Sequence, residues 1–201
     1  MSAYPLMLDG ESLSAVVVGG GVVATRKVRA LVDAGATVHV VALSISREIR
    51  RLAEGNERLT ITKRPYESSH LGDAMLVIAA TDDTELNARI ARDARGRLVN
   101  VASAPELGNV ATPAVHRAGD IVIAITAGRL PSAASRLRDA IGQRFDARYG
   151  DAVAALSSLR RTLIGAGQRD LWSDAADALV GENFCELVES GELDARMAAW
   201  R

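Results

Sequence analysis

The 201-residue sequence predicts an α/β protein whose first half is a doubly wound parallel sheet. Three observations predict this fold class. Short β-branched runs alternate with helix-forming stretches over the first 113 residues, a glycine-rich turn follows the first run, and strand-forming runs end at residue 126. The rest of the chain shows only helical patterning, which indicates a separate all-helical segment.

The strand candidates of the first 113 residues are short, apolar and rich in valine and isoleucine. They cover 14–18, 37–42, 59–63, 75–81 and 97–102, and helices are expected between them at 22–34, 45–54 and 84–95. Runs of this kind are typical of strands buried on both faces, which pair in parallel through right-handed helical crossovers. The order of the elements therefore predicts a doubly wound sheet.

The pattern changes after Pro113. One more strand is expected at 120–126 and a helix at 131–145, where Pro131 lies in the first turn, a position that tolerates proline. Beyond this helix, alanine and leucine recur with charged residues at helical spacing and no strand candidate is present. The sequence thus predicts three parts, which are 1–113, 114–145 and 146–201.

Composition argues against several classes of protein. The 24 Lys and Arg residues balance 25 Asp and Glu residues, and without a basic run we expect no nucleic-acid partner. The single cysteine, Cys185, excludes an internal disulfide, and His39, His70 and His116 are scattered, so no metal site is expected. No apolar run approaches the ~20 residues of a membrane span and no signal peptide is evident, which predicts a soluble, cytoplasmic protein without membrane contact.

The turn after the first strand carries a dinucleotide-binding pattern. Gly19-x-Gly21-x-x-Ala24 follows a strand and opens a helix, which is the context that this pattern has in a Rossmann domain. The first glycine permits a sharp turn, the second lets backbone N–H groups approach a pyrophosphate, and the helix N-terminus favours its negative charge. We therefore expect Gly19 and Gly21 to bind NAD. A tight turn without a ligand is the alternative.

The end of the second strand lacks the acidic residue that usually binds the adenosine ribose. The chain there reads Val40-Val41-Ala42-Leu43-Ser44. Backbone groups and the Ser44 hydroxyl would then hold the ribose. Because no arginine follows at once to receive a 2′-phosphate, NAD is favoured over NADP.

Polar residues also follow the fourth and fifth strands. Thr81 and Asn100 lie at the carboxyl ends of these strands, where open parallel sheets bind their ligands, and we expect both residues on the nicotinamide side of the site. The Thr-Asp sequence at 81–83 is equally typical of a helix N-cap, with Asp82 or Asp83 as the capping residue.

Five stretches taken together resemble a known family. They are YPLMLDG (4–10), VVVGGGVVATRKVRALVDAGATVHVVA (16–42), IAATDDTELNARIA (78–91), NVASAPELGNVATPA (100–114) and GDIVIAITAGRLPSAASRLRDAIG (119–142). In this order, over about residues 3–145, the chain is similar to the precorrin-2 dehydrogenase/sirohydrochlorin ferrochelatase family, which includes the N-terminal module of siroheme synthase.

The resemblance implies an activity and a set of partners. Members of that family oxidise precorrin-2 to sirohydrochlorin with NAD, and several also insert ferrous iron to make siroheme. They are homodimers, so 114–145 is expected to be a dimerisation segment. On matching positions, Val22 and Val23 of the glycine loop and Leu43 and Ser44 after the second strand are expected to contact the cofactor.

The substrate side of the expected site requires cations, because precorrin-2 is a macrocycle with many carboxylate side chains. Arg129, Arg136 and Arg138, near the last strand-to-helix turn, are candidates to pair with these carboxylates. Each of them is equally compatible with a solvated helix surface.

The chain departs from the family pattern at two positions of the substrate side. Ser103 stands where the family has the aspartate implicated as general base and in chelation, and Leu130 replaces the serine before Pro131. A serine hydroxyl does not accept a proton at neutral pH unless another group activates it. Glu106 and His116 are the candidate substitutes, although His116 is also compatible with a surface turn.

Three interpretations follow from this departure. The chain is a precorrin-2 dehydrogenase that uses another proton acceptor, or a dehydrogenase that has lost chelation, or a non-catalytic dimer that binds NAD or a tetrapyrrole. We favour an NAD-dependent dehydrogenase whose ferrochelatase activity is in doubt.

Overall fold

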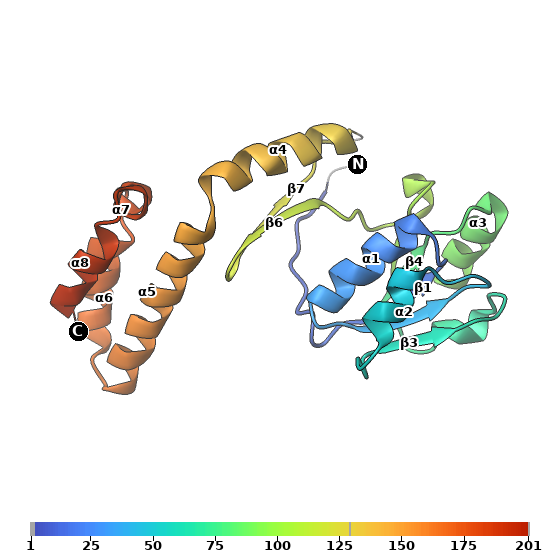
Figure 1. Cartoon of the computed structure of the whole chain (residues 1–201), viewed down its shortest axis with the longest axis horizontal. Helices are drawn as coiled ribbons and strands as arrows, with labels where there is room; N and C mark the ends of the chain where they lie inside the picture. The colour runs from blue at the N-terminus through green and yellow to red at the C-terminus, as the bar shows by residue number, and fades with distance from the viewer. Residues whose placement is uncertain (1–2, 129, 201) are drawn as a thin grey trace. The chain divides into compact units, whose positions relative to one another are not determined.

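The computed structural model describes residues 3–128 and 130–200. The chain divides into two compact units, one ending at Thr112 and the other beginning at Pro113. Figure 1 shows the first unit in blue to green and the second unit in yellow-green to red. Each unit has its own core, and each is described here by itself.

The first unit is built on a five-stranded sheet with the order β3-β2-β1-β4-β5, in which every pairing is parallel. Its strands are β1 (Ser14–Val18), β2 (Thr37–Val41), β3 (Leu59–Thr62), β4 (Leu76–Ala79) and β5 (Leu98–Val101). Val18 pairs with both Val41 and Ala79, so the first, second and fourth strands end together at one edge of the sheet.

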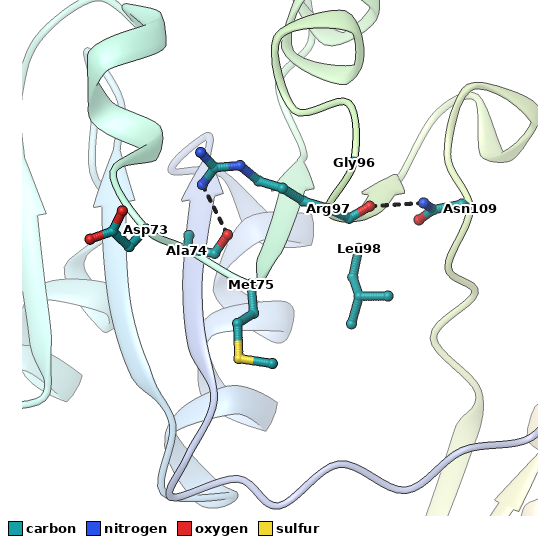
Figure 2. A pocket seen from close by; sticks show the side chains of 7 residues that line it. All are labelled: Asp73, Ala74, Met75, Gly96, Arg97, Leu98 and Asn109. Carbon is teal, nitrogen blue, oxygen red and sulfur yellow. Dashed lines mark hydrogen bonds between the residues drawn. The ribbon is translucent and has the colours of Figure 1, made fainter.

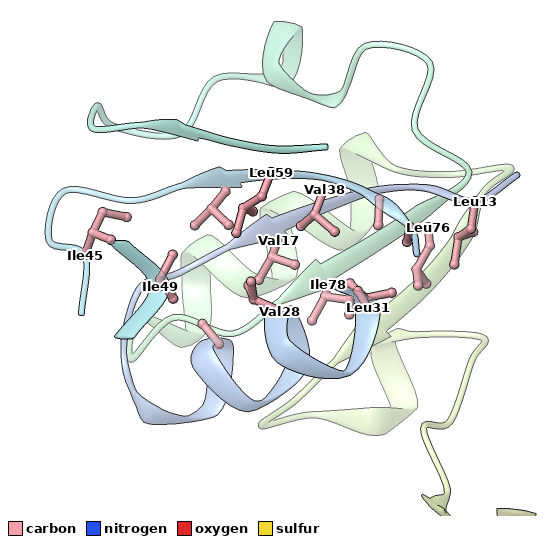
Figure 3. Close-up of a cluster of buried hydrophobic side chains, with 14 residues drawn as sticks. Leu13, Val17, Val28, Leu31, Val38, Ile45, Ile49, Leu59, Leu76 and Ile78 are labelled. Carbon is pink, nitrogen blue, oxygen red and sulfur yellow. The ribbon is translucent and has the colours of Figure 1, made fainter. Parts of the chain in front are cut away.

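Helices cover both faces of this sheet. They are α1 (Val22–Asp33), α2 (Arg47–Ala53) and α3 (Thr84–Asp93), with the short helices η1 (Ser68–Leu71) and η2 (Pro105–Leu107) in connections. Val17 and Val38 point to the face covered by Val28 of α1 and Ile49 of α2, as Figure 3 shows. The alternate strand residues pack instead against Ile90 of α3. The strands are therefore buried on both faces, which explains their nearly continuous apolar sequences.

The second unit begins with a two-stranded antiparallel sheet made of β6 (Ala114–Ala118) and β7 (Ile121–Ile125). Helix α4 (Pro131–Arg144) packs on this sheet. The remaining elements are α5 (Ala147–Gly165), α6 (Arg169–Leu179), α7 (Phe184–Ser190), α8 (Leu193–Met197) and η3 (Ala198–Trp200), which share one apolar core around Tyr149, Leu156 and Leu187.

The predicted α/β fold class is confirmed, and each predicted strand and helix occurs within a few residues of its expected bounds. One strand and the short helices η1 and η2 were not predicted. The sequence was compatible with a surface turn around His116, but this segment forms strand β6. In its pairing with β7, His116 lies opposite Ile123. The further division of the second unit at residue 145 stays a prediction. In the described ranges, no helix is long and apolar enough to cross a lipid bilayer.

Candidate cofactor and substrate site

The glycine-rich loop lies where the ends of β1, β2 and β4 meet. The N–H of Gly19 donates to the carbonyl oxygen of Val41 at 2.9 Å, and the N–H of Ala80 donates to that of Val18 at 2.8 Å. The N–H of Ser46 donates to the carbonyl oxygen of Gly20 at 3.0 Å. The loop is therefore fixed from both sides at the carboxyl edge of the sheet, where ligands of open α/β folds bind.

Two of the three glycines are required by the packing of the chain itself. Gly19 has φ +127°, and a β-carbon there would lie 2.2 Å from the carbonyl oxygen of Ala80. A β-carbon at Gly20 would lie 2.0 Å from the carbonyl oxygen of Ser44. Gly20 occupies the x position of the Gly-x-Gly pattern, which accepts any residue. The sequence indicated a special role for it only through the run of three consecutive glycines.

Gly21 differs, because the chain does not need it to be glycine. It is the N-cap of α1, with φ −81° and ψ −166°, an extended conformation open to any residue. A β-carbon there would meet nothing within 4 Å. The missing side chain leaves open space beside the first N–H groups of α1, which have no hydrogen-bond partner in the described chain. This is the arrangement that a diphosphate requires.

Exposed apolar side chains surround this space. Val22 is 88% exposed, Leu43 is 67% exposed and Val23 is 41% exposed. Ser44 is also exposed, and its hydroxyl makes no hydrogen bond to residues 3–128 or 130–200. In contrast, Ser46 is occupied, since its hydroxyl accepts from the N–H of Ile49 at 3.1 Å and caps α2.

The loop therefore fits a dinucleotide by three properties. It offers unpaired N–H groups at the start of a helix, a gap that a side chain would close, and apolar surface for the flat faces of the nucleotide. It lacks an acidic group for the ribose, as the sequence predicts, so Ser44 is the free hydroxyl at the end of β2.

A buried amide links Thr81 to Ser103 across the same edge of the sheet. The Asn87 side chain is 1% exposed. Its Oδ1 accepts from the Thr81 N–H at 3.2 Å, and its Nδ2 donates to the Thr81 carbonyl oxygen at 2.9 Å and to Ser103 Oγ at 3.2 Å. The structure thus brings the predicted residues Thr81 and Ser103 together through Asn87, which the sequence analysis missed.

The Thr81 hydroxyl is engaged within the protein. It lies 2.7 Å from Asn87 Oδ1 and 3.0 Å from the carbonyl oxygen of Asp83, to either of which it can donate its hydrogen. Asp83 is the N-cap of α3, and its carboxylate accepts from the N–H groups of Glu85 and Leu86. Of the two capping candidates, Asp83 is therefore the cap. A cofactor contact of Thr81 stays a prediction.

Asn100 is 7% exposed and points away from the α3 face of the sheet. Its Nδ2 donates to the carbonyl oxygen of Val110 at 2.8 Å, which fixes the orientation of the amide. Its Oδ1 is buried and has no partner in the described part of the chain. A buried acceptor without a donor is costly, so this atom is suited to receive a ligand N–H. Its predicted cofactor contact stays a prediction.

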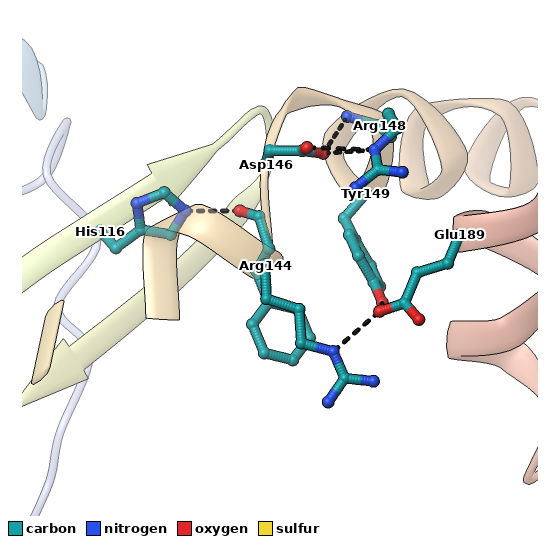
Figure 4. Close-up of polar contacts among 7 residues, drawn as sticks. His116, Arg144, Asp146, Arg148, Tyr149 and Glu189 are labelled. Atoms are coloured by element: carbon teal, nitrogen blue, oxygen red, sulfur yellow. Dashed lines mark hydrogen bonds and ion pairs between the residues drawn. The ribbon is translucent and has the colours of Figure 1, made fainter. Parts of the chain in front are cut away.

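The candidate proton acceptors fall in different units. Glu106 lies in η2, exposed, three residues after Ser103, which is also exposed. His116 belongs to β6 of the second unit, and its Nε2 forms a 2.6 Å hydrogen bond with the carbonyl oxygen of Phe145 (Figure 4). The imidazole thus already joins β6 to the end of α4.

The three candidate substrate arginines also differ. Arg129 lies outside the described residues. Arg138 pairs with the neighbouring Asp139 carboxylate at 2.6 Å, whereas Arg136 is exposed and has no ion pair with a described residue. Because residues two apart on a helix point in different directions, Arg136 and Arg138 present their charges on different sides of α4.

Two of the three histidines, which are far apart in the sequence, lie close together in the fold. His39 and His70, which are scattered in the sequence, lie with ring centroids 6.1 Å apart, because η1 packs on the face of the sheet that carries Val41 and His39 of β2. Burial lowers the pKa of His39, whose Nε2 is 2.9 Å from Thr62 Oγ1. Among the described residues, no group of three or more His, Cys, Asp or Glu side chains is placed to hold a metal ion.

A shallow hollow of the first unit lies away from this site. Figure 2 shows it at the amino ends of β4 and β5, lined by Met75, Arg97 and Asn109, among others. The Arg97 guanidinium donates to the carbonyl oxygens of Leu71 and Ala74 there, so it serves the fold. None of the predicted site residues lines this hollow.

Comparison with known proteins agrees with this geometry. Residues 6–114 match the model of a family described as "Putative NAD(P)-binding". The chain is 36% identical to a siroheme synthase of Pseudomonas aeruginosa (strain LESB58), over 100% of this chain and 42% of that protein. It is 35% identical to a siroheme synthase of Saccharophagus degradans, over 80% of this chain and 36% of that protein.

A solved structure titled "SirC, precorrin-2 dehydrogenase" covers nearly the whole molecule. It is 26% identical, has a TM-score of 0.76, and the alignment covers 98% of this chain and 100% of that chain. The chain spans about two fifths of the length of the siroheme synthases that it matches. Since the family model covers more than half of the sequence and includes the glycine loop and all five parallel strands, the chain belongs to this NAD(P)-binding family.

Proposed function

We propose that this chain is an NAD-dependent dehydrogenase that oxidises precorrin-2 to sirohydrochlorin in siroheme biosynthesis. The observation that carries the proposal is the glycine loop, whose unpaired N–H groups face a gap beside Gly21 that the protein itself does not use. The proposal is supported by the likeness of the whole chain to SirC and by its identity to siroheme synthases.

The glycine loop and the strand ends would bind the cofactor. The N–H groups of Gly21, Val22 and Val23 would hold the diphosphate, and Leu43 and Ser44 would hold the adenosine ribose. The orphaned Oδ1 of Asn100 needs an N–H donor, which the carboxamide of a nicotinamide offers. NAD supplies the oxidation by accepting a hydride from the substrate.

The chain must then orient a polyanionic macrocycle and accept a proton. Arg136, Arg138 and Arg129 are the candidates to pair with its carboxylates. Since oxidation of precorrin-2 releases one hydride and one proton, a base is required besides the cofactor, and Glu106 and His116 are the candidates.

The decisive experiment is turnover by the purified chain. With precorrin-2 and NAD, the chain should form sirohydrochlorin, seen in the visible spectrum, and one NADH for each sirohydrochlorin, seen by its absorbance. Calorimetry should detect NAD binding, with weaker binding of NADP. NAD binding without turnover would favour the non-catalytic alternative, which the loss of the family aspartate at Ser103 makes a real competitor. Failure to bind NAD under any condition would end the proposal.

Three further properties belong to this proposal. We expect a homodimer, which sedimentation can measure, and a cytoplasmic location, which cell fractionation can test. Ferrous iron is a substrate only if the chain also chelates. Because Ser103 offers a hydroxyl where the family has a carboxylate, we expect siroheme formation from sirohydrochlorin and Fe²⁺ to be no faster than without protein, and Ser103→Asp to raise it.

A further inference from the structure

The orientation of the Asn87 amide is fixed by the backbone of a single residue. A backbone N–H can only donate a hydrogen bond and a carbonyl oxygen can only accept one. Asn87 Oδ1 faces the N–H of Thr81 and Nδ2 faces its carbonyl oxygen, at 3.2 and 2.9 Å. Turning the amide over would set oxygen against oxygen and nitrogen against N–H. The positions of nitrogen and oxygen are therefore determined by hydrogen bonding.

This orientation determines the direction of the bond to Ser103. The second hydrogen of Asn87 Nδ2 points to Ser103 Oγ, 3.2 Å away, and an amide nitrogen has no acceptor capacity. Ser103 Oγ is therefore the acceptor, and the hydroxyl hydrogen must point elsewhere. No other hydrogen bond engages this hydroxyl within residues 3–128 and 130–200, and the side chain is exposed.

We propose that Asn87 is a positioning residue that makes Ser103 a hydrogen-bond donor to the substrate and not a proton acceptor. The proposal rests on the proposed function, because it assigns the ligand of the Ser103 hydroxyl as a carboxylate side chain of the tetrapyrrole. A hydroxyl that donates a hydrogen bond suits a carboxylate acceptor. Because the buried amide already holds the Ser103 oxygen in place, the side chain loses little further conformational freedom when the substrate binds. The proton released in the reaction goes to another group.

The same amide couples the two sides of the site. Thr81 closes the end of β4 and Ser103 begins the connection after β5, and Asn87 holds both from α3. All four of its hydrogen-bonding positions are used, counting the Thr81 hydroxyl at 2.7 Å. A fully satisfied buried amide rigidifies the groups around it. The Ser103 oxygen is thus held in register with the strand end on the expected cofactor side.

The direction of the bond can be tested without any ligand. In ¹⁵N-labelled full-length protein, the two Nδ2 hydrogens of Asn87 should both be protected from exchange. Ser103→Ala should shift one of them upfield and speed its exchange, while the matched variant Ser68→Ala, at an exposed serine in η1, should leave both unchanged. If Asn87 does not respond to Ser103→Ala, the proposal is wrong. Because Ser103 is exposed, we expect this variant to fold.

Kinetics test the role toward substrate. Ser103→Ala should lower kcat/KM for precorrin-2 by about tenfold to a hundredfold, the value of a hydrogen bond to a charged group, with the NAD Kd unchanged. The loss should be the same at every pH, and Ser103→Thr should restore most of the activity. A pH limb that is present in the wild type and missing in Ser103→Ala would identify Ser103 as the proton acceptor and overturn the proposal.

The two experiments separate the possible failures. If the wild-type chain does not oxidise precorrin-2, the proposed function fails, and sirohydrochlorin binding takes the place of kcat/KM. Ser103→Ala should then weaken that binding about tenfold or more. Unchanged affinity, with the Asn87 hydrogens responding as expected, would leave a structural link only and would overturn the role toward substrate.

Discussion

At the scale of single residues, the three consecutive glycines have two different causes. Gly19 and Gly20 are glycine because carbonyl oxygens of Ala80 and Ser44 occupy the positions of their side chains. Gly21 faces open space and has an ordinary backbone conformation. Gly21 is therefore the residue of the three whose substitution best separates binding from folding.

We expect Gly21→Ala to fold with at most the small loss of stability that alanine causes in place of a glycine N-cap, because its β-carbon has room. It should bind NAD about tenfold or more weakly, since overpacking against the diphosphate costs ~1–3 kcal/mol. Gly20→Ala should instead lower the free energy of unfolding by at least that amount, because its β-carbon has no room. Urea denaturation and calorimetry measure the two effects. Equal NAD affinity of Gly21→Ala and the wild type would contradict a diphosphate at this loop.

At the scale of elements, the start of α3 combines a capping function and a site function. Asp83 accepts hydrogen bonds from two N–H groups of the first turn, and the adjacent Asp82 is exposed and has no such role. The cap fixes where the helix begins, and hence where Asn87 reaches Thr81 and Ser103.

Asp83→Ala should therefore destabilise the first unit by ~0.5–2 kcal/mol, the usual cost of losing such a cap. Asp82→Ala is the matched control, because it removes the same charge from the neighbouring position and should change stability little. Denaturant unfolding followed by far-UV circular dichroism measures both. A similar loss in the two variants would mean that charge, and not capping, is responsible.

The junction of α4, α5 and α7 is held by a second polar cluster. Glu189 accepts from Arg144 Nε at 2.7 Å and from the Tyr149 hydroxyl at 2.8 Å, as Figure 4 shows. Burial, and then the bond to Glu189, raises the pKa of Tyr149 to about 12. The phenol is neutral in the folded unit well above the pH at which it ionises in the unfolded chain.

This shift predicts how stability changes in base. A group whose pKa is raised on folding contributes stability below its unfolded pKa, near 10, and loses it as pH rises toward 12. At neutral pH, Tyr149→Phe should have a free energy of unfolding ~1 kcal/mol below that of the wild type, because the hydrogen bond to Glu189 is missing. Between pH 10 and 12, the free energy of unfolding of the variant should fall less steeply than that of the wild type. Thermal melts at pH 8, 10 and 11 test this, and parallel curves for the two proteins would contradict it.

At the scale of the whole molecule, the chain has two units with separate cores. The candidate cofactor residues all lie in the first unit, whereas Trp172 and Trp200, the two tryptophans of the sequence, pack against the core of the second. Tryptophan fluorescence therefore reports on the unit without the glycine loop.

NAD should stabilise the first unit alone, by RT ln(1 + [NAD]/Kd). We expect NAD to raise the free energy of unfolding measured by hydrogen exchange of amides in β1 and β4. The unfolding midpoint measured by tryptophan fluorescence should stay unchanged. Gly21→Ala serves as the control, in which the same NAD concentration should stabilise the first unit less than in the wild type. An equal shift of both transitions would show that the units unfold together.

Much of the fold and the place of the glycine loop at the carboxyl ends of the strands could be predicted from the sequence. Strands buried on both faces are nearly continuous apolar runs, so all five parallel strands were recognisable. Strand β6 was missed because Ala114–Ala118 includes a histidine and an arginine and pairs with only one neighbour, which weakens the pattern. The glycine loop was found because its pattern is local to one turn.

By itself, the sequence determined the order of the elements, the glycine loop and the serine in place of an aspartate, because each depends on residues adjacent in the chain. Only the tertiary structure decided that Gly20 is packed by Ser44, that His39 lies beside His70, and that Asn87 donates to Ser103. These contacts join residues far apart in sequence or turn on which atom of an amide faces which backbone group. Hydrogen-bond direction and steric contact exist only once the chain has folded, and local periodicity does not encode them.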